Sequence, residues 1–286
     1  MIPALEPTMS NRDASSAPRV ALLTGASGVI GKAIAHQLAA SGEYEVVLAC
    51  RNRAKAERTV RDIVRDLGRD AGSDTGSERV RYEIVDVARQ ASIAELVARW
   101  RGPLHVLINN AAAAPRVREE TPEGLERVFA TNVMGYFGMT RMFADLLARS
   151  APARVVNVTS YWAGGLDLDD LQLERRRYDN DVAYRQSKQA ERMLTVAFAE
   201  RLRERGVVVN ACHPGDVTSA LSHSLGFGGH DTPAQSAETP VWLVTSPEAG
   251  ALTGRYFEHQ RERSCRFGAE QDAVEALYRA CETLTG

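Results

Sequence analysis

Tyr184 and Lys188 lie four residues apart in AYRQSKQAERML, a segment whose pattern predicts a helix. Residues at this spacing share one face of a helix, so the phenol and the ammonium are expected to lie close together. A phenol with an ordinary pKa of about 10 is a poor base at neutral pH, and a nearby ammonium stabilises its phenolate form. The pair suits proton exchange with an alcohol or carbonyl oxygen. Lysine is rare here, since only three of the 35 basic residues are lysines.

A second group of residues has the spacing of a nucleotide-binding loop. In TGASGVIG, Gly25, Gly28 and Gly31 stand between an apolar run over 20–24 and a helical pattern over 29–41. A strand, a glycine turn and a helix in this order can place a pyrophosphate against the backbone N–H groups of the helix N-terminus. The alternative is a purely structural turn. The predicted coenzyme-binding residues of the loop are Thr24, Gly25, Ser27, Gly28, Val29, Ile30 and Gly31.

The residues after the second predicted strand bear on the choice of coenzyme. They are Cys50, Arg51, Asn52 and Arg53, and none of them is acidic. NAD-dependent enzymes usually place an acid here on the adenosine ribose, whereas a guanidinium offers paired donors to a 2′-phosphate. We therefore expect Arg51, Asn52 and Arg53 to favour NADP(H), with NAD(H) as the other coenzyme. The alternative is that these arginines are ordinary solvated side chains.

Short apolar runs alternate with longer amphipathic ones along the chain. Strands without clean alternation, separated by helices, predict a parallel sheet covered on both faces. We expect one doubly wound α/β domain over 18–286 with a seven-stranded, mostly parallel sheet, preceded by a disordered tail over 1–17. The segment over about 214–240 is rich in Gly, Pro, Ser and Thr, and is expected to be a substrate lid. The expected strands are 20–24, 44–50, 79–87, 104–110, 154–160, 207–214 and 254–258, and the expected helices are 29–41, 53–68, 89–100, 122–149, 182–205 and 237–246.

Composition argues against several classes of partner. The 286 residues carry a formal net charge of −2, which gives no reason to expect nucleic acid or an anionic membrane surface, so a small-molecule substrate is expected. The four cysteines are scattered and the histidines are not at ligand spacing, so we expect neither a disulfide framework nor a metal site. The N-terminal segment is not typical of a signal peptide, and no run of 18 apolar residues occurs. A cytoplasmic protein is expected.

Together these motifs resemble the short-chain dehydrogenase/reductase family from about Val20 to the C-terminus. The resemblance adds further segments in the family's order: NNA at 109–111, Asn132 in TNVMGYF, Ser160 in VVNVTS and HPG at 213–215. LACRNRAKAE, the insert LDLDDLQLERRRYDN and the tail ALYRACETLTG are similar to the branch of the retinol dehydrogenases and protochlorophyllide reductases. The resemblance implies a compact Rossmann-type domain.

The resemblance also implies roles for individual residues. Tyr184 would be the general acid in reduction and the base in oxidation. Lys188 would lower the pKa of Tyr184 and bind the nicotinamide ribose, Ser160 would donate to the substrate oxygen, and Asn132 would hold a helix and a water that relay protons to Lys188. Structural alternatives remain: a loop cap for Ser160, a helix kink for Asn132 and a half-buried aromatic for Tyr184. The remaining implied coenzyme contacts are Asp86, Val87, Asn110, Ala111, Ala112, Pro214, Gly215, Val217 and Thr218.

Three details of these assignments are open. Asp86 at the end of the third strand is expected to accept a hydrogen bond from adenine or to cap the following helix. The chain has NNAA where the family usually has NNAG, and the methyl of Ala112 fits only if the backbone there avoids positive φ. His213 is expected to be a structural loop residue. By analogy with relatives, a homodimer or homotetramer is expected, paired through the helices over 122–149 and 182–205.

These features predict an NADP(H)-dependent oxidoreductase that interconverts a carbonyl and an alcohol on a fairly apolar small molecule. Two other functions agree with part of the sequence. The common family pattern TGxxxGxG has a glycine where this chain has Val29, and the spacing observed matches the longer relatives that epimerise or dehydrate nucleotide sugars with retained NAD. The other alternative is a coenzyme-binding sensor with little turnover. Only 102 residues follow Tyr184, which argues against the first, and the complete set of Ser160, Tyr184 and Lys188 argues against the second.

Overall fold

The computed structural model describes residues 17–71 and 79–285. One sheet runs through this part of the chain in the strand order β3-β2-β1-β4-β5-β6-β7-β8, and every neighbouring pair is parallel except β7 and β8. The order reverses direction between β1 and β4, which is where open α/β sheets bind ligands beyond the carboxyl ends of their strands. The strands are β1 (Arg19–Thr24), β2 (Tyr44–Cys50), β3 (Val80–Ile84), β4 (Val106–Asn109), β5 (Ala153–Val158), β6 (Val207–His213), β7 (Tyr256–Glu258) and β8 (Arg261–Arg263).

The prediction of a doubly wound, mostly parallel sheet is confirmed, and all seven expected strands are present. The eighth strand, β8, pairs antiparallel with β7 at the sheet edge. Its three residues are all charged and exposed, so it carries no apolar pattern that could reveal it in the sequence. The prediction of seven strands was therefore one strand short.

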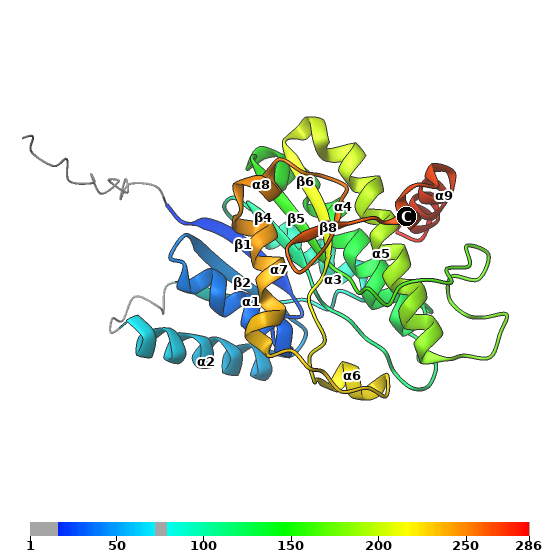
Figure 1. Ribbon diagram of the computed structural model, residues 1–286, viewed down its shortest axis with the longest axis horizontal. Coiled ribbons are helices and arrows are strands. Elements are labelled where there is room, and N and C mark those ends of the chain that lie inside the picture. Colours follow the sequence, from blue (N-terminus) through cyan, green and yellow to red (C-terminus); the bar gives the residue numbers. More distant parts are fainter. Residues whose placement is uncertain (1–16, 72–78, 286) are drawn as a thin grey trace, which may run out of the picture.

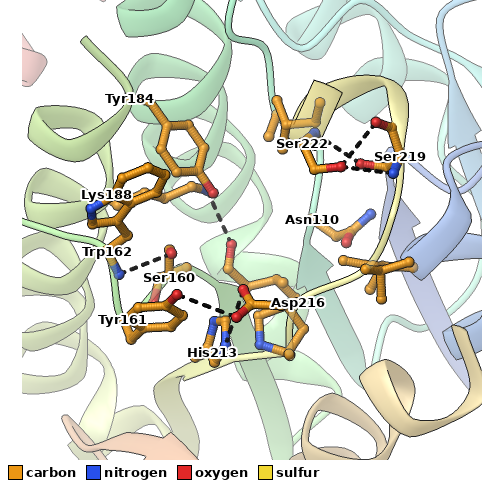
Figure 2. A pocket seen from close by; sticks show the side chains of 18 of the residues that line it. Asn110, Ser160, Tyr161, Trp162, Tyr184, Lys188, His213, Asp216, Ser219 and Ser222 are labelled. Carbon is orange, nitrogen blue, oxygen red and sulfur yellow. Dashed lines mark hydrogen bonds and ion pairs between the residues drawn. The ribbon is translucent and has the colours of Figure 1, made fainter. Parts of the chain in front are cut away.

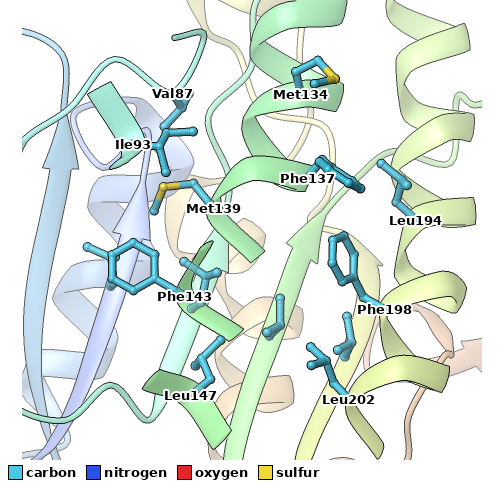
Figure 3. Close-up of a cluster of buried hydrophobic side chains, with 14 of the residues drawn as sticks. Val87, Ile93, Met134, Phe137, Met139, Phe143, Leu147, Leu194, Phe198 and Leu202 are labelled. Atoms are coloured by element: carbon cyan, nitrogen blue, oxygen red, sulfur yellow. The ribbon is translucent and has the colours of Figure 1, made fainter. Parts of the chain in front are cut away.

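Helices cover both faces of this sheet, as Figure 1 shows. On one face, the side chains of α1, α2, α7 and α8 pack into one apolar cluster with the strands; on the other, α3, α4, α5 and α9 form a second cluster. Figure 3 shows the second cluster, in which Phe137, Phe143 and Phe198 pack against the sheet. The helices are α1 (Val29–Ala40), α2 (Arg53–Ala71), α3 (Gln90–Arg99), α4 (Gly135–Arg149), α5 (Asn180–Leu202), α6 (Ala220–Ser224), α7 (Pro233–Thr245), α8 (Pro247–Gly250) and α9 (Gln271–Thr283), with single turns η2 (Phe129–Met134), η3 (Arg203–Arg205) and η4 (Arg266–Gly268).

Two predicted boundaries differ from the structure. The helix expected over 122–149 starts later, because Glu126 caps the backbone N–H groups of Val128 and Phe129 and a π-helical turn, η2, precedes α4. The last part of the segment over 214–240 is helical, because α7 begins at Pro233. Thr232 caps α7, and Ala237 in that helix is fully buried against the sheet, so the connection beyond β6 ends at Thr232. Residues 1–16 of the predicted tail lie outside the described residues.

The C-terminal helix α9, which the sequence patterns did not predict, covers part of α5. The Tyr278 ring packs at 5.1 Å from that of Phe137 and at 5.4 Å from that of Phe198, measured between ring centroids. Met139 and Phe143 of α4 point into the protein's own core and are fully buried. The apolar side chains of these helices are thus largely used within the chain, and the homo-oligomer expected by analogy with relatives stays a prediction.

Candidate active site

The glycine loop between β1 and α1 holds its backbone too tightly for side chains at two of its three glycines. Gly25 has a φ of +65°, and a Cβ there would lie 2.7 Å from the Cα of Ala111. A Cβ on Gly31 would lie 2.5 Å from the carbonyl oxygen of Gly25, so this glycine lets helix and loop meet. Gly28 has extended geometry at the N-cap of α1 and is close only to that same carbonyl, at 3.3 Å. Gly25 therefore forms the tight turn, Gly31 allows α1 to pack closely on the loop, and Gly28 lines the groove.

An open groove runs along the carboxyl ends of the strands beside this loop. Its floor is backbone and small side chains, and the N-terminus of α1 points into it, which suits the pyrophosphate and adenosine of a dinucleotide. Among the predicted coenzyme-binding residues, those that line the groove are Gly25, Ser27, Gly28, Val29, Ile30, Gly31, Arg51, Asp86, Val87, Asn110, Ala111 and Ala112.

Replacing Gly31 with Ala is expected to strain the loop. A new methyl group must displace the Gly25 carbonyl or the Cα of Ala26, 2.8 Å away, and overpacking of this kind costs about 1–3 kcal/mol. Urea denaturation should therefore show a lower free energy of unfolding for Gly31→Ala. Gly28→Ala is the matched control, with stability closer to wild type, because its backbone is extended and its methyl group meets only the Gly25 carbonyl, at 3.3 Å. Equal stabilities for the two variants would contradict this description of the loop.

Thr24 joins β1 to β4 and does not line the groove. Its buried hydroxyl accepts hydrogen bonds from the backbone N–H groups of Asn110 at 2.9 Å and Ala111 at 3.1 Å. The Asn110 amide in turn donates to the Thr24 carbonyl at 3.0 Å. Thr24 thus holds together the two segments that form the groove floor, and its predicted contact with the coenzyme stays a prediction.

The cations that line the groove differ in part from the two arginines, Arg51 and Arg53, that the sequence suggested. Arg51 lines the groove together with Lys55, which sequence reasoning did not single out as a coenzyme ligand. Arg53 points elsewhere, since its guanidinium donates to the Tyr82 hydroxyl at 2.9 Å, and Asn52 uses its side chain to accept from the backbone N–H of Lys55 at 2.9 Å. Neither Arg53 nor Asn52 lines the groove. Their coenzyme contacts stay predictions, and Lys55 joins Arg51 as a candidate.

The structure bears on two of the open details, the contacts of Asp86 and the backbone conformation of Ala112. Asp86 lines the groove, and one of its carboxylate oxygens also accepts from the backbone N–H of Ala88 at 3.1 Å, so it orders the turn before α3 while facing the groove. Ala112 is not among the residues with positive φ, so its methyl group is accommodated without strain.

A second pocket, which shares Ile30, Asn110 and Ala112 with the groove, holds the residues predicted to transfer protons (Figure 2). Tyr184 and Lys188 enter it from α5, and Ser160 enters it from the carboxyl end of β5. Lys188 Nζ lies 5.3 Å from the centroid of the Tyr184 ring, and Ser160 hydrogen-bonds to the Tyr184 side chain. The structure thus brings together all three residues, which the sequence separates by up to 28 positions.

The acidity of Tyr184 results from opposing influences. Burial raises the pKa of the Tyr184 phenol above its ordinary value; the Lys188 ammonium lowers it, Glu191 raises it and the hydrogen bond with Ser160 lowers it. The net direction is upward, which keeps the phenol protonated at neutral pH. A protonated phenol is the form that donates a proton to a carbonyl oxygen.

Asn132 lies in η2, one layer behind the pocket. Its side-chain carbonyl accepts from the backbone N–H of Ala113 at 2.8 Å, and its amide donates to the Ser187 hydroxyl at 2.9 Å and to the Ala113 carbonyl at 3.2 Å. Asn132 therefore links the segment after β4, at Ala113, to α5. These contacts agree with a structural role for Asn132, and its relay of protons to Lys188 stays a prediction.

The connection after β6 forms the remaining wall of the pocket. Pro214, Gly215 and Val217 line it, whereas Thr218 exchanges hydrogen bonds with the backbone of Gly229 and lines neither the pocket nor the groove. The Thr218 hydroxyl thus closes the base of the loop, and its predicted contact with the coenzyme stays a prediction.

Further contacts fasten this loop across the pocket. The Asp231 carboxylate accepts from the backbone N–H of Asp216 at 2.7 Å, the Asn180 amide donates to the Ser224 carbonyl at 3.0 Å, and Ser224 donates to the Ala114 carbonyl at 2.5 Å. Leu221 of α6 lines both the pocket and the groove. A substrate lid in this connection stays a prediction.

His213 also faces the pocket but is not charged there. Burial lowers the pKa of its imidazole to about 4, although Asp216 opposes this effect. Its ring packs edge-to-face on Tyr161 with centroids 4.6 Å apart. These contacts agree with the structural role expected of His213.

Two buried charged residues behind the pocket were missed in the sequence. Glu191 holds the ammonium of Lys188, with a nitrogen–oxygen distance of 2.8 Å. Arg192 donates a hydrogen bond to the backbone carbonyl of Ser160, and its guanidinium carbon lies 3.5 Å above the centroid of the Tyr256 ring. Glu191 and Arg192 stand three and four positions after Lys188 on a predicted helix, and this spacing could have indicated that they lie near the Lys188 side chain.

Replacing Arg192 with Met is expected to reduce turnover without touching the substrate pocket. The variant loses the charged hydrogen bond that fixes the Ser160 backbone, a bond of a type worth about 1.5–3 kcal/mol. We expect kcat/KM to fall by about 10- to 100-fold, mainly in kcat. Arg255→Met, at an exposed arginine next to Tyr256 that pairs with Glu262, is the matched control and should keep near-normal turnover. Identical kinetics for both variants would contradict the positioning role.

No group of three or more His, Cys, Asp or Glu side chains in residues 17–71 and 79–285 is placed to hold a metal ion. No helix in the same part of the chain combines the length and apolar character needed to cross a membrane.

Comparison with known proteins agrees with this geometry. Residues 19–226 match the family described as short chain dehydrogenase. Retinol dehydrogenase 13 of Mus musculus is 33% identical over 276 residues, covering 90% of this chain and 80% of that protein, and a probable oxidoreductase of Streptomyces antibioticus is 34% identical over 273 residues, covering 88% of each. Salutaridine reductase of Papaver somniferum shares the fold, with a TM-score of 0.65 and 21% identity over 84% of this chain and 99% of that one. The chain therefore belongs to the short-chain dehydrogenase/reductase family of oxidoreductases and is similar to its retinol dehydrogenase branch.

Proposed function

We propose that the protein uses NADP(H) to interconvert a carbonyl and an alcohol on a fairly apolar small molecule. The observation that carries this proposal is the position of Tyr184, Lys188 and Ser160 in one pocket that opens into the groove beside the glycine loop. A substrate oxygen at Tyr184 would then be within reach of a coenzyme whose phosphates lie at the N-terminus of α1.

In the proposed reaction, Tyr184 donates its proton to the carbonyl oxygen during reduction and takes it back during oxidation. Ser160 donates a hydrogen bond to the same oxygen, while Lys188 stabilises the phenolate that forms when Tyr184 gives up its proton. The nicotinamide, when bound, supplies the hydride or accepts it. Asn132 and Thr24 keep the strand ends in register around these groups.

Aromatic and aliphatic side chains support an apolar substrate. Trp162 and Phe227 face the pocket with ring centroids 5.5 Å apart, and Tyr161 and Leu221 line it with them. The name of the mouse relative adds a long, apolar aldehyde to the candidates. A carbonyl panel for this protein should therefore include retinaldehyde, aromatic ketones, aliphatic ketones and a polar sugar aldehyde, with the last expected to be the poorest substrate.

The coenzyme preference is testable at Arg51 and Lys55. These two cations line the adenosine end of the groove, where a 2′-phosphate would gain charge-assisted hydrogen bonds. Replacing both with Ala should raise the Kd of NADPH by at least about tenfold and leave that of NADH nearly unchanged, as measured by titration of coenzyme fluorescence. Arg53→Ala is the matched control, since Arg53 is held by Tyr82. Equal losses for both coenzymes, or wild-type binding of NADH tighter than NADPH, would contradict the preference.

A further inference from the structure

Glu191 extends the proton-transfer pair into the interior of the protein. Its side chain is fully buried, and both of its carboxylate oxygens accept hydrogen bonds from the Lys188 ammonium, at 2.8 and 3.0 Å. Tyr184, Lys188 and Glu191 follow one another at spacings of four and three on α5, so their side chains lie along one face of the helix. The ammonium that faces Tyr184 is therefore held from behind by an opposite charge.

Three elements enclose this ion pair. Lys188 Nζ also lies 5.6 Å from the centroid of the Tyr136 ring on α4 and 3.4 Å from the Val158 carbonyl at the end of β5. The charged and titratable groups that face Glu191 are Lys188, Arg192 and Tyr184 from α5 and Tyr136 from α4, and Cys212 of β6 interacts with Lys188 and Tyr136.

The charge of Glu191 works against that of Lys188 at the phenol. Burial raises the pKa of Glu191 to about 7, with Lys188 and Arg192 opposing the rise, so the carboxylate is ionised at alkaline pH, where a tyrosine loses its proton. A negative charge in a buried site disfavours a second negative charge nearby, and the Tyr184 phenolate is such a charge. Lys188 favours the phenolate and Glu191 disfavours it.

We propose that Glu191 is a positioning residue: it fixes the Lys188 ammonium beside Tyr184 and, through its charge, keeps the Tyr184 phenol less acidic than Lys188 alone would make it. The proposal rests on the proposed function, because it treats Tyr184 as the proton donor and acceptor. Glu191 lines neither the pocket nor the groove, so it would act on the substrate only through Lys188 and Tyr184, which do line the pocket.

The direct test is the titration of Tyr184 in the full-length protein without coenzyme or substrate. Protein labelled with ¹³C at the tyrosine ζ carbon gives one resonance for each of the eight tyrosines, and the resonance missing from Tyr184→Phe is that of Tyr184. In Glu191→Gln, whose amide oxygen can still accept from Lys188, the Tyr184 resonance should titrate at least about one pH unit lower than in wild type. An unchanged or higher titration midpoint would overturn the proposal.

Two further variants complete the experiment. Glu191→Met, similar in length and uncharged, replaces Glu191→Gln if the latter does not fold, and the same downward shift is expected. Asp170→Asn removes another buried carboxylate, one that faces Arg176 and not the pocket, and should leave the Tyr184 titration at its wild-type position. An equal shift in Asp170→Asn would also overturn the proposal.

Kinetics then separate this proposal from the proposed function. With any carbonyl that the protein reduces, the alkaline limb of the kcat/KM profile should move to lower pH in Glu191→Gln by the same amount as the Tyr184 resonance. A purely structural role would lower kcat without moving the limb, and that result would overturn the positioning role. Absence of turnover with every carbonyl would count against the proposed function, while the titration of Tyr184 would still decide the role of Glu191.

Discussion

Replacing Tyr184 with Phe should lower kcat for carbonyl reduction by about 10²- to 10⁴-fold, the range that a positioned general acid contributes. The substitution removes one hydroxyl from a buried ring, and the ring itself remains in place between Ser160 and Lys188. The glycine loop and the cations of the groove are untouched, so the Kd of NADPH should stay near its wild-type value. Steady-state kinetics and a fluorescence titration on the same preparation measure both quantities.

A tyrosine outside the pocket provides the control for this substitution. Tyr178→Phe removes a hydroxyl that donates to the Pro115 carbonyl at 3.1 Å; neither residue lines the pocket, so this variant should keep most of the activity. Retention of most activity by Tyr184→Phe would contradict the proposed mechanism. Loss of coenzyme binding in that variant would instead assign Tyr184 to the binding site.

Replacing Lys188 with Met should have the largest combined effect on stability and activity. It leaves the Glu191 carboxylate buried without its partner, and breaking a buried ion pair in this way costs about 3–5 kcal/mol. It also removes the positive charge that stabilises the Tyr184 phenolate. Urea denaturation should show the loss of stability, and kcat/KM should fall at least as far as in Tyr184→Phe.

The double variant Lys188→Met/Glu191→Leu separates these two effects. Apolar side chains of similar volume can replace a buried ion pair with little loss of stability, so the free energy of unfolding should recover toward wild type. Turnover should not recover, because the ammonium is still absent. Recovery of both stability and turnover would contradict a direct role for Lys188 in the reaction.

The core of the site followed from local patterns in the sequence. The four-residue spacing of Tyr184 and Lys188 fixes their common helix face wherever that helix packs, and a glycine turn between a strand and a helix has few other geometries. Parallel strands that alternate with helices bring the ends of β1, β4, β5 and β6 to one sheet edge, which gathers Ser160 with the helix pair. These features depend on short stretches of chain.

Other residues could not be assigned from short stretches because their partners are distant in sequence. The Thr24 hydroxyl bonds to the backbone of Asn110, 86 positions away, because β1 lies beside β4, and the sequence of the loop alone could not indicate this structural bond. The Arg53 guanidinium donates a hydrogen bond to Tyr82 on β3, whereas Lys55 lines the groove. Helical spacing alone could have indicated that Lys188 and Glu191 form a pair. The burial of this ion pair depends on residues distant in sequence, among them Tyr136 on α4 and Val158 at the end of β5.

The central claim is that this pocket reduces carbonyl compounds with NADPH and with a proton from Tyr184. Its most direct test is the rate at which wild-type protein and Tyr184→Phe consume NADPH and NADH with each member of the carbonyl panel. We predict consumption of NADPH by the wild type with at least one apolar aldehyde or ketone, slower consumption of NADH, and loss of both in Tyr184→Phe. Tight binding of NADPH with no consumption across the panel would contradict the claim and would indicate a coenzyme-binding protein without this activity.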